Sequence, residues 1–408
     1  MPAVSHPNAP DSPVRLDDWA TAREAFRSRD LRQGLYDEAG LLMHDVIVNL
    51  HGDAHRSRRR LENRLFRRDT FLWYEHRIIP ETIAEMAGEA LATGHGDLLA
   101  LARRTMMKLA CVIAGLDIVD SEFESVFALM SRLAMASTAF HATTDRDRLR
   151  ADGLNALAEV DERFIQPAIA RRSALVSAHR RGDLPLDHLP RDVLTTLLLN
   201  QDALELPGDV VIREVAYFPW VGSHSTSNAF VHAMHHLFDW CAANPADRAT
   251  LLGDPFRLQR FVHESLRLHP ASPETHRIAQ ADMTLGGRSI AVGQRVVIDM
   301  VKANRDPSVW GHNAEAFVPG RVLPEDASPW GLTFGHGIHA CLGMELAGGV
   351  AAEGRTDAST HLFGAITTMA RFLLEHGARP DPEDSYRLDE STVRMVYSKY
   401  PVLLGPSA

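Results

Sequence analysis

Residues 331–343 read GLTFGHGIHACLG, and this stretch decides the interpretation of the whole chain. Gly335 and Gly337 suit a tight loop, because glycine adopts positive φ angles at little cost and lets the backbone approach a flat ligand closely. Cys341 lies just before a plausible helix start, MELA (344–347). A cysteine at a helix N-terminus has a lowered pKa, since the helix dipole stabilises its thiolate. An isolated buried cysteine is usually inert, but a thiolate in a glycine-rich loop is a metal ligand or a nucleophile.

The stretch resembles the signature FGxGx[HR]xCxG of the cytochrome P450 family, the haem-thiolate monooxygenases. The matching residues are Phe334, Gly335, Gly337, His339, Cys341 and Gly343. The resemblance implies a mainly α fold with a small β portion, a triangular prism of helices around haem b. It implies that Cys341 is the axial ligand of the haem iron, that His339 faces a haem propionate and that Phe334 shields the sulfur. Since the chain has no CxxCH motif, the haem is expected to be bound non-covalently.

A second match lies in a predicted helix over 254–270, DPFRLQRFVHESLRLHP, whose Asp-Pro start and final proline are typical helix end signals. Glu264 and Arg267 are three residues apart, so they share a face and can pair. In this position they resemble the ExxR pair of the family, and Arg321 in FVPGR resembles its third member. A carboxylate between two guanidiniums can be fully hydrogen-bonded, and such a network is costly to break when buried.

Three basic residues match family positions that bind haem propionates. His55 and Arg59 match the motif HxxxR, and Arg277 lies in PETHRIA, where the family has an arginine. Between Arg56 and Arg68 the chain holds seven arginines. This run is either an ordinary solvated helix face or a docking patch for an acidic electron carrier, because charged patches raise encounter rates.

Residues 217–230, YFPWVGSHSTSNAF, interrupt a long helical pattern that would cross the distal side of the haem. Pro219 removes a backbone donor and Gly222 loosens the helix, so we expect the two to open it. Ser225 or Thr226 would bond the freed carbonyl groups.

The family pattern there is roughly [AG]Gx[DE]T[TS], whereas this chain has VGSHST (221–226). His224 replaces the acid and Ser225 the threonine, so His224, Ser225, Thr226 and Gly222 are the candidate catalytic residues. Histidine can relay protons near neutral pH. The substitution leaves open peroxide-driven oxidation, coupling or desaturation, a non-catalytic haem sensor or carrier, and a purely structural His224.

The composition of the chain limits its possible partners and its cellular setting. The chain has 408 residues, 45% of them hydrophobic, and a net charge of −10, which argues against a nucleic-acid partner. Three widely separated cysteines exclude a disulfide framework and indicate a reducing, cytoplasmic setting. No apolar run is long enough to span a membrane. We expect a disordered leader over 1–15 and one haem-thiolate domain over 16–408.

Hydrophobic periodicity predicts a mainly helical chain. The expected helices are 17–28, 54–68, 79–92, 98–115, 121–135, 150–180, 188–199, 209–242, 255–268 and 342–374, with strands near 283–300 and 392–404. The glycine-rich segment 348–360 suggests a break or insertion in the helix after the cysteine.

The resemblance therefore predicts a monooxygenase that uses O2 and external electrons to oxidise an apolar or aromatic small molecule. Since the chain has no room for a fused reductase, the implied electron donor is a separate ferredoxin or flavodoxin.

Overall fold

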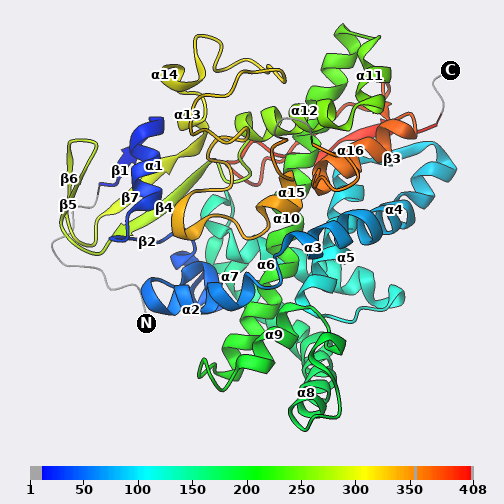
Figure 1. Ribbon diagram of the computed structural model, residues 1–408. Helices are drawn as coiled ribbons and strands as arrows, with labels where there is room; N and C mark the ends of the chain where they lie inside the picture. The colour runs from blue at the N-terminus through cyan, green and yellow to red at the C-terminus, as the bar shows by residue number, and fades with distance from the viewer. Residues whose placement is uncertain (1–11, 353–355, 406–408) are drawn as a thin grey trace.

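The computed structural model describes residues 12–352 and 356–405 as a mainly helical body with small sheets at its sides (Figure 1). The helices are α1 Trp19–Arg27, α2 Gly52–Glu62, α3 Arg68–Trp73, α4 Ile79–Thr93, α5 Leu98–Ala114, α6 Phe123–Ser137, α7 Arg146–Val160, α8 Gln166–Arg180, α9 Val193–Asn200, α10 Gly208–Ala243, α11 Asp247–Gly253, α12 Pro255–Leu268, α13 Met300–Ala303, α14 Pro307–Trp310, α15 Met344–Gly348 and α16 Ala365–Glu375. The fold class expected from the sequence is confirmed.

The strands form four small sheets. They are β1 Val14–Leu16, β2 Leu31–Gln33, β3 His95–Asp97, β4 Glu274–Ala279, β5 Met283–Leu285, β6 Arg288–Ile290, β7 Arg295–Asp299, β8 Arg379–Pro380, β9 Arg387–Leu388, β10 Tyr397–Lys399 and β11 Pro401–Leu403. The largest sheet has the order β1-β7-β4-β2, with β1 parallel to β7 and the other pairs antiparallel. It lies to the left of the helical body in Figure 1.

Most predicted helices are present, but the helix expected over 150–180 is divided. The expected helix 150–180 consists of α7 and α8 joined by a π-helical turn over Asp161–Ile165. The predicted leader was too long, because Val14 to Leu16 pair with β7 as an edge strand. Residues 1–11 of that leader lie outside the described residues.

The central helix α10 runs through the middle of the body and packs along α5 (Figure 1). The expectation that Pro219 and Gly222 open this helix is wrong, since α10 is continuous over all 36 residues. Ser225 Oγ donates to Val221 O at 2.8 Å, a bond to the carbonyl group four residues earlier in the same helix. A Cβ on Gly222 would lie 3.5 Å from Ala110 Cβ on α5, so this glycine lies at the contact between the two helices.

The predicted network around Glu264 is present and buried. Arg267 donates to both carboxylate oxygens of Glu264 at 2.7 and 2.8 Å, and Arg321 Nε donates to Oε1 at 3.2 Å. The backbone N–H of Val318 donates to the same oxygen at 3.0 Å. The remaining Arg267 donors reach backbone carbonyls of Asn304 and Ala314 at 2.6 and 2.8 Å. Both charges are thus fully paired, the condition under which a buried ion network is stable.

This network is tied to the cysteine loop through Asn304, from the ANRDP stretch. Asn304 Nδ2 donates to Arg267 O at 2.9 Å and to Thr333 Oγ1 at 3.1 Å, and Asn304 Oδ1 accepts from Leu332 N at 2.7 Å. Thr333 Oγ1 in turn donates to Leu266 O at 2.6 Å. Residues 332–333 are therefore fixed against the end of α12.

The single helix expected over 342–374 is wrong, and the break suspected at 348–360 is confirmed. The chain leaves α15 at Gly349 (φ 75°) and enters α16 after Gly364 (φ 87°). A Cβ on Gly364 would lie 2.3 Å from Gly349 N, so the two ends of the excursion touch. Gln259 Nε2 holds this neck by donating to Leu362 O and Phe363 O at 3.2 and 3.1 Å. Residues 353–355 of the suspected insertion lie outside the described residues.

In the described part of the chain, no helix is both long and apolar enough to cross a membrane.

We expect Arg267→Ala to lower the free energy of unfolding by about 3–5 kcal/mol, because it leaves the buried Glu264 carboxylate partly unpaired. Urea denaturation monitored by circular dichroism measures this change. Arg260→Ala is the matched control, because Arg260 is exposed on the same helix; we expect it to change stability by less than about 0.5 kcal/mol. Equal effects of both changes would show that the network does not carry the stability assigned to it.

Candidate functional site

The cysteine loop has the conformation that its glycines predict. Gly335 and Gly337 have φ angles of 68° and 69°, in the left-handed region that favours glycine. A Cβ on Gly337 would lie 2.5 Å from the backbone oxygen of Phe26, so α1 packs directly on the loop. Cys341 N donates to Phe334 O at 2.9 Å, which closes the loop. Gly343 precedes α15 with φ −89° and an unobstructed Cβ position.

The Cys341 thiol lies in a recess. Its side chain is accessible to solvent, yet burial by the surrounding protein raises its pKa. The backbone N–H of Gly343 and the positive charge of Arg59 act in the opposite direction and lower the pKa. A cation beside the sulfur would therefore favour the thiolate further.

The four predicted propionate-binding residues gather near this recess. The rings of His55 and His339 lie 4.2 Å apart, and Arg59 Nη2 donates to Ala340 O at 2.5 Å. Arg277 is buried, and its Nη1 donates to Gln33 Oε1 at 2.6 Å. Burial and the charges of His55 and Arg277 lower the pKa of His339 to about 3. The side chains come from α2, β4 and the cysteine loop, so three distant segments build this cluster.

The cluster is suited to bind the negatively charged side of a cofactor, such as the two propionates of haem. The His339 Nε2 atom is buried without a hydrogen-bond partner among the described residues. The charges that act on His339 come from His55, Arg277, His51 and Arg59, and none of them is negative. Two propionates would supply the missing acceptors, while the Cys341 thiol supplies a soft donor suited to iron. Phe334 packs at the edge of Gly348 behind the loop, and its shielding of the sulfur stays a prediction.

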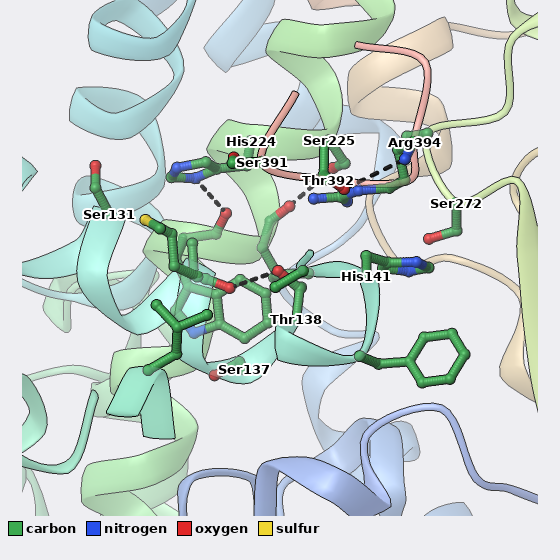
Figure 2. A pocket seen from close by; sticks show the side chains of 18 of the residues that line it. Ser131, Ser137, Thr138, His141, His224, Ser225, Ser272, Ser391, Thr392 and Arg394 are labelled. Carbon is green, nitrogen blue, oxygen red and sulfur yellow. Dashed lines mark hydrogen bonds between the residues drawn. The ribbon is translucent and has the colours of Figure 1, made fainter. Parts of the chain in front are cut away.

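A cavity of about 190 Å³ lies along α10 and is lined mainly by polar side chains (Figure 2). Hydroxyl groups are abundant in its wall, from Tyr36, Ser131, Ser137, Thr138, Thr144, Ser225, Ser272, Ser391 and Thr392. Tyr36 lines the cavity. Burial raises the pKa of Tyr36 to about 12, and the negative charge of Cys341 contributes to this shift.

His224 faces this cavity, as expected, but its titration differs from the expectation. Its Nδ1 lies 3.1 Å from both Trp220 O and Ser223 Oγ; the tautomer with the proton on Nδ1 donates to the carbonyl and leaves Nε2 as an acceptor. Burial, with the nearby positive charge of Arg103, lowers the pKa of His224 to about 3. The expectation that this histidine titrates near neutrality is therefore wrong.

The other candidate catalytic residues on α10 lie in different surroundings. Ser225 is exposed and lines the cavity, with its hydroxyl hydrogen directed to Val221 O. Thr226 is buried and does not line the cavity. Gly222 lies at the contact with α5. The structure thus brings His224 and Ser225 together at the cavity and places Thr226 and Gly222 outside its wall.

Two lining residues, Arg103 and Arg394, were missed by the sequence analysis. Arg103 belongs to α5 and Arg394 to the segment between β9 and β10. No local pattern marks either of them, since a single arginine in a helix or loop is normally a surface residue.

We expect Gly337→Ala to destabilise the protein by at least about 1–3 kcal/mol, because alanine is strained at this φ angle and its Cβ meets Phe26 O. Gly343→Ala is the control, because its backbone is not in the left-handed region and its Cβ position is open. Thermal unfolding of the two variants measures the difference. If both variants unfold like the unchanged protein, the loop does not require glycine at 337.

The depressed pKa of His224 makes stability depend on pH. The unfolded chain takes up this proton near pH 6.5, whereas the folded protein does so only near pH 3. Its stabilising contribution is therefore complete above pH 6.5 and is lost as the pH falls toward 3. Between pH 7 and pH 5 we expect the unchanged protein to lose about 2 kcal/mol more than His224→Asn. Urea unfolding at both pH values measures this, with His188→Asn, an exposed histidine, as control. Identical pH slopes for all three proteins would contradict the shift.

Comparison with known proteins agrees with this geometry. The family profile described as Cytochrome P450 matches residues 257–348, which hold the Glu264 network and the cysteine loop. Cytochrome P450 monooxygenase sphH of Aspergillus fumigatus is 38% identical over 111 residues, 25% of this chain and 20% of that protein. Vitamin D(3) 25-hydroxylase of Pseudonocardia autotrophica is 32% identical over 222 residues, 53% of this chain and 49% of that protein. The chain thus spans between a fifth and about half of the length of these relatives.

Structural similarity to known proteins covers nearly the whole chain, beyond the segments matched in sequence. The crystal structure of CalO2 superimposes with a TM-score of 0.73 at 20% identity, covering 97% of this chain and 91% of that one. The matched motifs, the family profile and the curated relatives support a cytochrome P450, and the shared fold agrees with it.

Proposed function

We propose that this protein is a haem-thiolate monooxygenase that oxidises a small organic molecule in the cavity along α10. The observation that carries the proposal is the cysteine loop fixed by Asn304, whose thiol lies beside a basic cluster in which His339 Nε2 has no partner among the described residues and no negative charge acts on His339. When bound there, haem supplies activation of O2 with electrons from a donor.

The residues that would hold haem b come from three segments. Cys341 would bind the iron, and His55, Arg59, Arg277 and His339 would bind the propionates. Arg59 and Arg277 keep a positive charge at any working pH, so each can form a charge-assisted hydrogen bond to a carboxylate. Gly335 and Gly337 keep side-chain bulk out of the loop. No covalent attachment is required.

His224 and Ser225 would organise water rather than donate protons themselves. The Ser225 hydroxyl hydrogen is directed to Val221 O, and the His224 Nδ1 hydrogen to Trp220 O, so both groups present lone pairs. Each can hold a water molecule by accepting one of its hydrogens. Ordered water would then carry protons to the reacting oxygen. A neutral His224 with a pKa near 3 suits this positioning role better than that of a general acid.

The relatives' names fit oxidation of small molecules, since one is called a monooxygenase and the other a hydroxylase. Among the alternatives raised by the sequence, no observation favours peroxide-driven oxidation, coupling, desaturation or a sensor over monooxygenation.

A separate electron donor would dock beside the cysteine loop. Five arginines of the Arg56–Arg68 run are exposed and form a basic surface: Arg56, Arg60, Arg64, Arg67 and Arg68. Arg58 is instead buried against Glu214 at 2.7 Å, and Arg59 points to the loop. An acidic ferredoxin or flavodoxin would match this basic surface.

Cys341→Ala tests the proposal. The reduced, haem-loaded protein with carbon monoxide is expected to show the red-shifted Soret band of thiolate ligation, and this variant is expected to lose it. Cys241→Ala is the control, because Cys241 lies near the end of α10, away from the loop. Oxygen consumption with a reconstituted donor and product analysis then measure turnover. A Soret band unchanged in Cys341→Ala would remove Cys341 as the ligand.

A further inference from the structure

Two arginines with free donors face the cavity along α10. Arg103 comes from α5 and Arg394 from the segment between β9 and β10, and both contribute to its wall. Figure 2 shows Arg394 entering the cavity beside Ser225 and Thr392. The charges of both arginines act on His224 and lower its pKa, so the two guanidiniums lie near the same imidazole.

Neither guanidinium has a protein partner in the described part of the chain. The Nε atoms of Arg103 and Arg394 are buried without a hydrogen-bond partner. No ion pair involves either side chain among the described residues, although 33 such contacts are formed elsewhere. Neighbouring Arg104 shows the contrast, since it pairs with Glu124 on the surface. Both arginines are partly buried, so two guanidiniums without a protein partner at one cavity are suited to bind an incoming anion.

The single carboxylate in the cavity wall is already engaged. Asp389 Oδ1 accepts from Ser391 N and Ser391 Oγ at 2.9 and 2.5 Å, which stabilises the turn before Arg394. Its charge offsets part of the burial cost of both arginines without bonding to either. The cavity wall therefore holds two cations against one anion, with neutral histidines at His141 and His224.

The position of Arg394 is fixed by the surrounding backbone. Val393 N donates to His141 O at 3.0 Å, and Thr143 N donates to Ser391 O at 3.0 Å. Ala142 and Thr392 form an isolated antiparallel bridge. An arginine held in this way loses little freedom on binding, which is the preorganisation expected of a recognition residue.

We propose that the substrate carries an anionic oxygen group, a carboxylate or a phosphate ester, which Arg103 and Arg394 bind. The planar guanidinium matches both groups, because its parallel donors form bidentate hydrogen bonds. The apolar wall of Leu35, Phe140, Leu149 and Trp220 takes the rest of the molecule. The sequence alone indicated an apolar or aromatic substrate; the structure adds a charged end to it.

The volume limits the size of this substrate. At about 190 Å³ the cavity is below the roughly 300–1,000 Å³ of pockets for drug-sized ligands. A compact aryl or short alkyl acid fits this space better than a large polycyclic one.

The inference rests on the proposed function, since it assumes that this cavity is the substrate site. Binding can nevertheless be measured without turnover, by isothermal titration calorimetry on the haem-loaded protein. The probes are 3-phenylpropanoate and decanoate, their neutral amides, and 2-phenylethyl phosphate. We expect at least one anion to bind about 10-fold or more tightly than its neutral counterpart. The affinity for 2-phenylethyl phosphate, compared with that for 3-phenylpropanoate, shows whether the site prefers a phosphate ester or a carboxylate.

Arg103→Gln and Arg394→Gln are each expected to weaken binding of the anion about 10- to 100-fold, the loss expected for a charge-assisted hydrogen bond. Binding of the amides should change less than about threefold. Arg104→Gln is the matched control and is expected to bind the anions normally. The inference fails if anions bind no better than amides in every pair, or if both arginine variants retain full affinity for the anion. Arginine-dependent binding without product would leave the inference standing and refute the proposed oxidation.

A second measurement needs no ligand. Arg103→Met and Arg394→Met remove a partly buried charge that has no protein partner, so we expect the melting temperature to stay level or rise, as at many binding sites. A melting temperature lowered by several degrees in both variants would show that the arginines stabilise the fold, and would overturn their assignment to substrate.

Discussion

The carboxylate of Glu264, held between Arg267 and Arg321, is the interaction on which the rest of the structure depends. Arg267 is entirely buried; its Nε and Nη2 donate to Glu264 on the same helix, and its Nη1 donates to the backbone carbonyls of Asn304 and Ala314. Asn304 then connects the end of α12 to residues 332–333 of the cysteine loop. One ion network therefore joins α12, the segment after α13 and the loop. The thiol is positioned by this chain of contacts rather than by the short helix that follows it.

A common principle governs the two sides of the site. Although its net charge is −10, the protein places basic side chains with unsatisfied nitrogen atoms at two sites. Near Cys341 this atom is His339 Nε2, beside the positive charges of Arg59 and Arg277, and along α10 these atoms are the Nε atoms of Arg103 and Arg394. Buried polar atoms without partners are unfavourable, so an anion that arrives from outside best explains each site. Binding of the cofactor and of the substrate would therefore raise the free energy of unfolding of the protein.

The sequence predicted those parts of the site that depend on short motifs. The cysteine loop and the Glu264 network were predicted because their residues are close in sequence or have fixed spacing. The continuity of α10 was not, since the propensity of Pro219 is overridden by tertiary packing, above all against α5. The low pKa of His224 was also missed, because burial and the charge of Arg103 are properties of the folded protein. Arg103 and Arg394 are 291 residues apart in sequence, so no local pattern could pair them.

The contact between Gly349 and Gly364 allows the excursion between them to change in sequence while the cysteine loop stays the same. Since the two ends of the excursion touch, a change in its length costs little loop-closure free energy, although His361 and Leu362 next to the neck are buried. Its far end contacts the basic helix region, where Arg68 donates to Thr360 O at 3.1 Å. Insertions or deletions there could alter which proteins this face recognises while the cysteine loop stays in place. New partners could thus be acquired by changing the excursion alone, on a catalytic frame that is already optimised.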